Sequence, residues 1–134
     1  MPPHRPLSPV FGGEGKSEGP APVEPALVTR TYDLLLWFVN HVGKFPKSHR
    51  YVLGERIETA VLNTLLLLVE AAYTREKIPL LERANLELEK LRFLIRIGKD
   101  LGFTSLKQYE YASAEVVGLG QQVGGWLRQQ RRRG

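Results

Sequence analysis

The sequence contains no cysteine. This absence excludes disulfides, cysteine-ligated metals and thiol nucleophiles, and it suits a reducing compartment, so we expect a cytoplasmic protein. Long apolar runs are also lacking, because the longest, residues 65–69, is far too short to cross a bilayer. The N-terminus does not combine a charged start with an apolar run, so no signal peptide is predicted. We expect no membrane partner.

Recognisable catalytic and metal-binding motifs are lacking as well. The three histidines occur in no Glu-x-x-His or His-Glu-x-x-His pattern. Residues 15–17 (Gly-Lys-Ser) resemble the end of a phosphate-binding loop, but Val10 stands where that motif needs glycine. We therefore predict no catalytic residue, no metal and no cofactor, and we expect that the protein is not an enzyme. An enzyme with an unrecognised site would require a pocket lined by carboxylates with perturbed pKa values.

The chain divides into three segments by composition. Residues 1–25 hold most of the nine prolines and have little apolar surface to bury, which predicts a disordered arm. Residues 26–128 carry helical periodicity, and residues 129–134 form a basic tail. Helices are expected over residues 26–43, about 48–74, 79–101 and from 105 through 126. Pro79 suits a first helical turn, Gly102 suits a C-terminal cap, and Ser105 with Gln108 forms a capping-box pair.

Each predicted helix has one apolar stripe that should face a shared core. The predicted core positions are Leu27, Leu34, Leu35, Phe38, Val42, Leu53, Ile57, Ala60, Val61, Thr64, Leu68, Ala71, Leu80, Ala84, Leu88, Leu91, Ile95, Gly98, Tyr109, Ala112, Val116, Leu119, Val123 and Trp126. Residues 65–68 are apolar nearly all round, so the second helix should be buried on more than one side. No segment alternates with period two, and short connections favour an all-α, up-down-up-down four-helix bundle.

The fourth predicted helix is unusually rich in glycine. Its glycines are Gly118, Gly120, Gly124 and Gly125. Each costs about 1 kcal/mol against alanine in a helix interior. Two interpretations stay open: a frayed or broken helix, or close approach of this backbone to another helix or subunit.

Positive charge is concentrated at the C-terminus. The formal net charge is +5, but residues 128–134 contain four arginines, while residues 1–25 contain two basic and three acidic side chains. The helical segment is therefore only modestly basic. A basic balance favours polyanionic partners, and its placement matters more than its sum.

Two basic clusters stand out within the helical segment. In residues 44–51, cations alternate with aromatic residues at a helix start, where backbone N–H groups can help to hold phosphate. Arg92, Arg96 and Lys99 follow the spacing i, i+4, i+7 and share one helix face. They could form an ordinary solvated face. However, both arginines stand in an otherwise apolar segment with few acidic neighbours, which favours a subunit interface or a polyanion.

Four stretches carry a resemblance to a known family: residues 45–54 (FPKSHRYVLG), 91–96 (LRFLIR), 107–112 (KQYEYA) and 124–127 (GGWL). The chain resembles the accessory variability determinant (Avd) proteins of diversity-generating retroelements over about residues 27–128. These proteins belong to a wider four-helix-bundle family, which includes proteins encoded in intervening sequences of bacterial 23S ribosomal RNA genes.

The resemblance implies a homopentameric barrel of four-helix protomers. It also implies binding of the retroelement reverse transcriptase and of nucleic acid, in support of mutagenic retrohoming, in which a template RNA is copied into error-laden cDNA. It implies no catalysis. Arg92 and Arg96 match the family's basic surface on the third helix, and Lys47, His49 and Arg50 match its basic loop and helix start.

We therefore expect an oligomeric scaffold in which Arg92 and Arg96 contact phosphates or an acidic protein surface, with Lys99 assisting. The alternatives are a protein of the ribosomal intervening-sequence type, or a helical scaffold that binds only proteins and has nonspecific affinity for nucleic acid. A shallow salt dependence of RNA binding would favour the protein-only scaffold.

Overall fold

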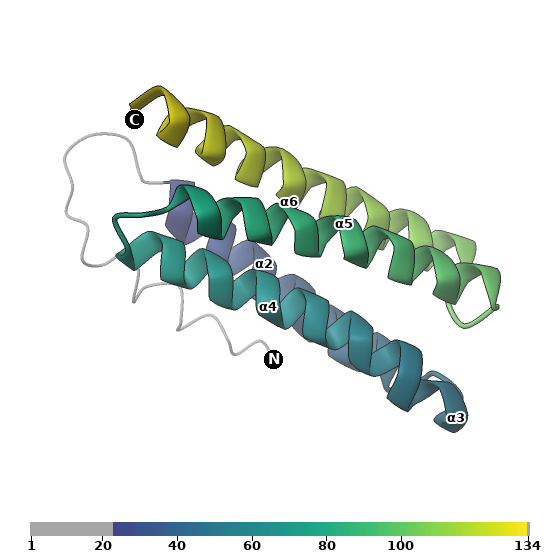
Figure 1. Ribbon diagram of the computed structural model, residues 1–134. Coiled ribbons are helices and arrows are strands. Elements are labelled where there is room, and N and C mark those ends of the chain that lie inside the picture. Colours follow the sequence, from purple (N-terminus) through teal and green to yellow (C-terminus); the bar gives the residue numbers. More distant parts are fainter. Residues whose placement is uncertain (1–22, 134) are drawn as a thin grey trace.

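The computed structural model describes residues 23–133, which form four long helices and no strand (Figure 1). The long helices are α2 (Val23–Val42), α4 (Glu55–Tyr73), α5 (Ile78–Asp100) and α6 (Leu106–Arg133). A short helix, α3 (Lys47–His49), and a π-helix, η1 (Arg50–Gly54), join α2 to α4. The all-α prediction and the number of helices are confirmed.

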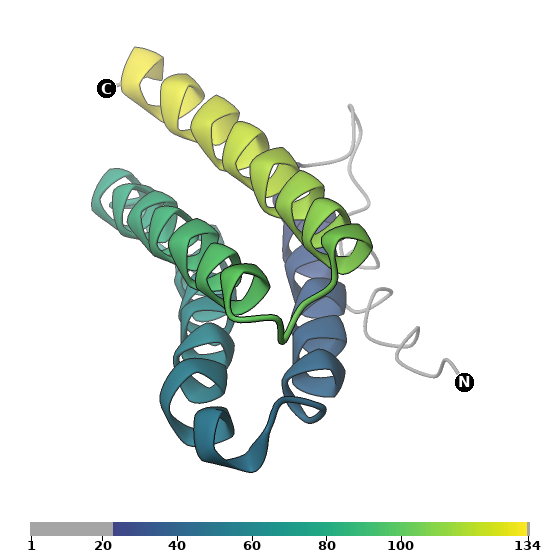
Figure 2. The same cartoon turned by 90° about the vertical axis from the view of Figure 1, so that its right-hand side faces the viewer.

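The four long helices pack side by side with consecutive helices antiparallel, as short connections require. Figure 2 shows α4 and α5 on one side of the bundle and α2 and α6 on the other. The turn between α4 and α5 lies at the same end as the C-terminus of α6, and α3 lies at the opposite end (Figure 1).

The core follows the predicted stripes closely. All seven predicted positions of the second helix, from Leu53 to Ala71, are buried. In α5 the core position is Leu81 and not Leu80, which is half-buried, because the buried stripe continues in alternating steps of three and four residues. Leu35 and Tyr109 are also half-buried rather than core residues.

One prediction about the core is wrong for a single chain. The second helix was expected to be buried on more than one side, but Leu62 is 42% exposed and Leu66 is 55% exposed. Both leucines lie on the side of α4 opposite its buried stripe. They are one helical turn apart, and at about 100° per residue they point away from the buried positions. The bundle therefore presents an apolar outer surface on α4.

The predicted second helix is also not continuous. Its first turns form α3 and η1, and η1 has the wider turn of a π-helix. Gly54 ends η1 against α2, where a Cβ atom would overlap the Val42 Cγ1 atom. Glycine is therefore required at this crossing. The wide turn leaves Tyr51 and Val52 exposed.

The end of α5 is closed by a Schellman motif around Gly102. Gly102 has a φ of +86°, which favours glycine, and its amide donates to the Lys99 carbonyl oxygen at 3.0 Å. The Phe103 amide donates to the Gly98 carbonyl oxygen at 2.9 Å. The predicted glycine cap is confirmed, and the chain reverses within a few residues to start α6.

The start of α6 is the predicted capping box. The Gln108 amide donates to Ser105 Oγ at 3.1 Å, and the Ser105 amide donates to Gln108 Oε1 at 2.9 Å. From there α6 continues without a break to Arg133. The interpretation of a broken glycine-rich helix is therefore wrong, and residues 129–133 of the predicted tail extend this helix.

One of the α6 glycines makes room for an arginine of α2. A Cβ atom at Gly118 would overlap the Arg30 guanidinium, which is held there by two partners. Arg30 Nε donates to Glu115 Oε1 at 3.1 Å, and Arg30 Nη1 donates to Gln122 Oε1 at 3.0 Å. Gly118 therefore accommodates a side chain of α2, and not the close backbone approach to another helix that the sequence suggested. At Gly120 nothing lies within 4 Å.

The other predicted segments meet the described residues at their edges. Residues 1–22 and 134 lie outside the part of the chain that the structure describes. The predicted arm, residues 1–25, and the Gly-Lys-Ser sequence at 15–17 therefore fall wholly or mostly there. The first helix begins at Val23 rather than at Ala26. No helix within residues 23–133 is long and apolar enough to span a membrane.

The two glycines Gly118 and Gly120 give a matched test of the Arg30 contact. Gly120→Ala should raise the free energy of unfolding by up to about 1 kcal/mol, because alanine favours the helix. Gly118→Ala should be neutral or lower it by about 1 kcal/mol, because displacing the guanidinium breaks two charge-assisted hydrogen bonds. Urea unfolding followed by circular dichroism measures both.

An Arg30→Met background provides the control. There Gly118→Ala should stabilise the protein as much as Gly120→Ala does, because no guanidinium remains to be displaced. Equal gains from the two alanines in the unmodified background would contradict the proposed role of Gly118.

Candidate nucleic-acid interface

The basic face of α5 borders a hollow of about 220 Å³ between α5 and α6. We call it the α5–α6 hollow, and it is lined by Glu89, Arg92, Phe93, Arg96, Tyr109, Ser113 and Val117. Its position follows from the core. With Leu91 and Ile95 buried, helical geometry turns Arg92 and Arg96 toward α6 rather than toward α4. The structure therefore brings the two predicted arginines together beside one concave surface.

Both arginines pair with carboxylates of their own helix at exposed positions. Arg92 Nη1 lies 3.0 Å from Glu89 Oε2, and Arg96 Nε lies 4.0 Å from Asp100 Oδ2. The arginine side chains are 54% and 64% exposed. Exposed pairs of this kind contribute little to stability, so a phosphate can replace either carboxylate at small cost. The few acidic neighbours expected from the sequence are the partners found.

Lys99 takes a different position from the two arginines. Its Nζ atom lies 4.9 Å from the centre of the Tyr109 ring and 3.6 Å from Asp100 Oδ1. About a third of its side chain is exposed. Lys99 thus reaches the hollow through a cation–π contact with one of its lining residues.

Phe93 was not among the predicted site residues. It is 63% exposed and lines the α5–α6 hollow between the two arginines in sequence. The sequence carried a signal for it, because position 93 lies off the stripe formed by Leu91 and Ile95. An aromatic ring beside guanidinium groups is the combination that stacks on nucleobases while phosphates are held nearby.

The other predicted residues, Lys47, His49 and Arg50, do not line this hollow. Lys47 is exposed at the start of α3, and the His49 ring lies 4.7 Å from the Phe103 ring. Arg50 is used within its own turn, where Nη2 donates to the Phe45 carbonyl oxygen at 3.3 Å. The Arg50 Nε atom is buried without a hydrogen-bond partner among the described residues. Arg50 therefore stabilises the loop more than it offers charge.

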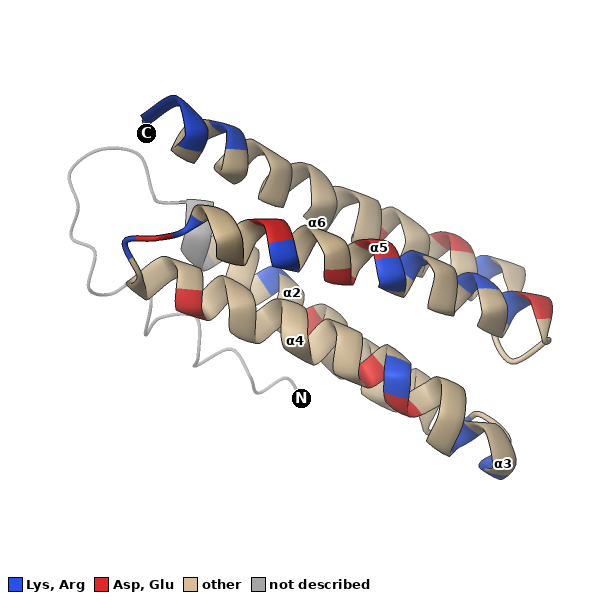
Figure 3. Cartoon of the chain, in the orientation of Figure 1, with Lys and Arg blue, Asp and Glu red and all other residues tan. Residues whose placement is uncertain are grey.

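The charge pattern along α5 differs from that at the end of α6. Figure 3 shows basic and acidic residues mixed along α5, whereas the last turns of α6 carry basic residues alone. The lining of the α5–α6 hollow therefore contains acidic as well as basic residues. Within it, Arg92, Arg96 and Phe93 are exposed to solvent.

A buried aromatic cluster holds the α5–α6 loop onto α2. His41 Nε2 lies 2.8 Å from Thr104 Oγ1, and the His41 ring stacks on Trp37 at 4.9 Å between centres. The Phe45 ring packs edge-on to His41 and contacts Phe103. Burial, assisted by the Lys44 charge, lowers the pKa of His41 below its usual 6.5. The neutral ring therefore belongs to the folded state.

One carboxylate among residues 23–133 has a perturbed pKa. Burial, and then the nearby Glu55 carboxylate, raises the pKa of Glu58. Glu58 does not line the hollow between α4 and α5, where Glu55 and Glu87 lie. Within residues 23–133 no group of three His, Asp or Glu side chains is placed to hold a metal ion.

Comparison with known families places this geometry in context. A family model described as bAvd-like matches residues 26–130. The chain belongs to the bAvd-like family. The resemblance expected from the four short sequence stretches is thereby confirmed. A search of curated proteins found no match.

The bAvd-like match spans nearly all of the described bundle. It includes every predicted site residue from Lys47 to Lys99 and both walls of the α5–α6 hollow. It ends at residue 130, before the last three arginines of α6. This Avd-type protein thus carries its strongest basic cluster at and beyond the end of the matched region.

The His41 contact predicts how stability depends on pH. His41 has a lower pKa folded than unfolded, so the unfolded chain takes up its proton first as pH falls below 6.5. Stability is then lost as pH decreases toward the folded pKa. His41→Gln keeps a hydrogen-bonding partner for Thr104 without this titration. Its unfolding free energy should fall less than that of the unmodified protein between about pH 8 and about pH 5.5.

Urea unfolding midpoints at both pH values measure this difference. A second variant without a titrating ring, His41→Asn, should show the same reduced pH dependence. The explanation fails if His41→Gln and the unmodified protein lose equal stability on acidification.

Proposed function

We propose that this protein is a non-catalytic accessory subunit of a diversity-generating retroelement. In this role it binds the retroelement reverse transcriptase and nucleic acid, template RNA or its cDNA, in the cytoplasm, and it supports mutagenic reverse transcription and retrohoming. Membership of the bAvd-like family supports this proposal. The observation that carries the binding role is the α5–α6 hollow, which is lined by two exposed arginines and an exposed aromatic ring.

Nucleic acid would bind here mainly through its backbone. Arg92 and Arg96 can exchange their exposed carboxylate partners, Glu89 and Asp100, for phosphate oxygens. Guanidinium groups hold phosphate oxygens in bidentate fashion. Phe93 offers a face on which any base can stack. None of these contacts distinguishes one base sequence from another, so binding would be largely sequence-independent.

The two arginines provide the direct test. Arg92→Gln combined with Arg96→Gln should lower the slope of log affinity against log salt concentration by about 1.4 for single-stranded RNA, since each lost phosphate contact removes about 0.7. Binding to the cognate reverse transcriptase should weaken in the same variant. Fluorescence anisotropy with a labelled RNA and calorimetry with the enzyme measure these effects.

Arg56→Gln with Lys90→Gln is the matched control. It removes the same charge from the hollow between α4 and α5, which Arg56 of α4 and Lys90 of α5 both line. The control should leave the salt slope nearly unchanged. An unchanged slope in the Arg92/Arg96 variant, with the fold intact by circular dichroism, would refute the binding role.

We also propose that the chain assembles as a homopentamer. The apolar outer surface of α4, with Leu62 and Leu66, and the exposed Leu86 of α5 support self-association, because apolar side chains spaced along neighbouring helices are costly to leave in water. Light scattering should then give a mass five times the 15.2 kDa of the chain.

Leu62→Lys combined with Leu66→Lys should shift that mass to the monomer without unfolding the helices, because both side chains are exposed in a single chain. Val39→Lys with Tyr111→Lys, at exposed apolar positions of α2 and α6, is the control and should keep the mass of the unmodified protein. A monomeric unmodified protein would overturn the pentamer.

The same apolar surface supports a second candidate, a helical scaffold that binds only proteins. In that case RNA binding would be weak, with a shallow salt slope in the unmodified protein. The RNA titration described above therefore separates the two candidates before any variant is made.

A further inference from the structure

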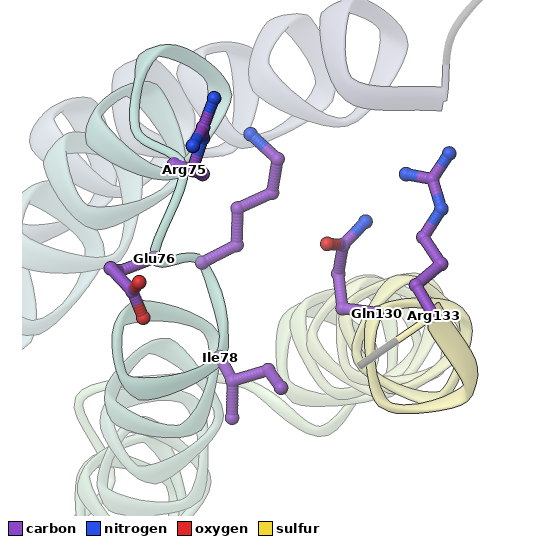
Figure 4. Close-up of a pocket in the computed structure, with 6 residues that line it drawn as sticks. Arg75, Glu76, Ile78, Gln130 and Arg133 are labelled. Carbon is purple, nitrogen blue, oxygen red and sulfur yellow. The ribbon is translucent and has the colours of Figure 1, made fainter.

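A second cationic surface lies at the end of the bundle opposite α3. The turn between α4 and α5 meets the last turn of α6 around a hollow of about 430 Å³ (Figure 4). We call it the C-terminal hollow, and it is lined by Arg75, Glu76, Lys77, Ile78, Gln130 and Arg133. Figure 4 shows Arg75 and Glu76 on one side of the hollow and Gln130 with Arg133 on the other. The α4–α5 turn and the last turn of α6, far apart in sequence, thus place cations on one concave surface.

The turn that carries Arg75 is held in place by Lys77. The Lys77 Nζ atom donates to the Ala71 and Thr74 carbonyl oxygens, each at 2.7 Å, and so closes the C-terminus of α4. Pro79 then fixes the first turn of α5. Because the Lys77 ammonium group is hydrogen-bonded to these carbonyl oxygens, Lys77 stabilises the turn. Arg75 is then the cation of this turn that can contact a ligand.

The two arginines that line this hollow, Arg75 and Arg133, are available to a ligand. Arg131 is paired, since its Nη2 atom lies 2.6 Å from Glu82 Oε2 and ties α6 to α5. Among residues 23–133, no acidic side chain pairs with Arg75, Arg132 or Arg133, and all three are exposed. The carbonyl end of α6 carries a partial negative charge of about one half, which is smaller than the charge of these arginines.

We propose that the C-terminal hollow binds the phosphate backbone of a nucleic-acid strand, as a second contact separate from the α5–α6 hollow. Arg75 and Arg133 would hold phosphate oxygens from two sides, and the Gln130 amide would donate a hydrogen bond between them. Among residues 23–133, Ile78 is the one apolar residue of the lining, so this part of the chain supplies no buried anchor typical of a protein interface. The described lining also has no aromatic ring for stacking, so the contacts that it offers are to the nucleic-acid backbone.

This inference rests on the proposed nucleic-acid binding, but it concerns a different surface. None of the residues that line the α5–α6 hollow lines this one. Arg75 lies inside the region that the family model matches, and Arg133 lies beyond its end at residue 130.

The test uses the full chain and a labelled single-stranded oligouridylate long enough to reach both hollows, titrated across salt. Arg75→Gln with Arg133→Gln should lower the salt slope by about 1.4 and weaken binding roughly tenfold or more at about 0.1 M salt. Adding Arg92→Gln and Arg96→Gln should lower the slope by about as much again, because the two surfaces are independent.

Each outcome separates the two claims. If Arg75→Gln with Arg133→Gln leaves the slope unchanged while the Arg92/Arg96 variant lowers it, the C-terminal hollow is not a nucleic-acid contact and the proposed function stands. If the Arg75/Arg133 variant binds RNA normally but loses the reverse transcriptase, the hollow belongs to a protein partner and the inference is overturned. Failure of the unmodified protein to bind RNA would overturn both. Arg56→Gln with Lys90→Gln again supplies the control for lost charge.

Discussion

Burial of the α5 stripe is the constraint on which the rest of the structure depends. Leu88, Leu91 and Ile95 must face the core, and the helical repeat then leaves no freedom in where the intervening side chains point. Arg92 and Arg96 lie on the flank that meets α6, whereas Phe93 points outward. The candidate interface is thus a by-product of core packing, because side chains that cannot enter the core are sorted by angle around α5.

The fold could be predicted from the sequence to the extent that its signals are local. The α4 stripe, the Gly102 cap and the capping box of α6 each depend on residues within a few positions, and all three are confirmed. The π-helix η1 could not be predicted, because its wide turn arises where Gly54 meets α2 across the bundle. The role of Gly118 likewise needs a partner, Arg30, from a distant segment.

The candidate site shows the same division. The spacing of Arg92 and Arg96 was enough to place them together, because both lie on one helix. Arg50 looked equivalent in the sequence but bonds to its own loop, which depends on the path of the chain after α2. The C-terminal hollow could not be predicted from the sequence, because Arg75 and Arg133 line one hollow only through the packing of α6 against the rest of the bundle. Charge that seemed to form a tail is therefore part of a shaped surface.

That α6 remains helical to Arg133 also has an entropic consequence. In a tail without regular structure, each residue that becomes fixed on a ligand would cost about 1–2 kcal/mol in lost backbone conformational entropy. Here the backbone is already ordered, as part of a 28-residue helix roughly 42 Å long. Only side-chain rotations are left to be restricted when the arginines engage an anion. The end of α6 is thus preorganised, and it holds its charges at fixed positions relative to the bundle.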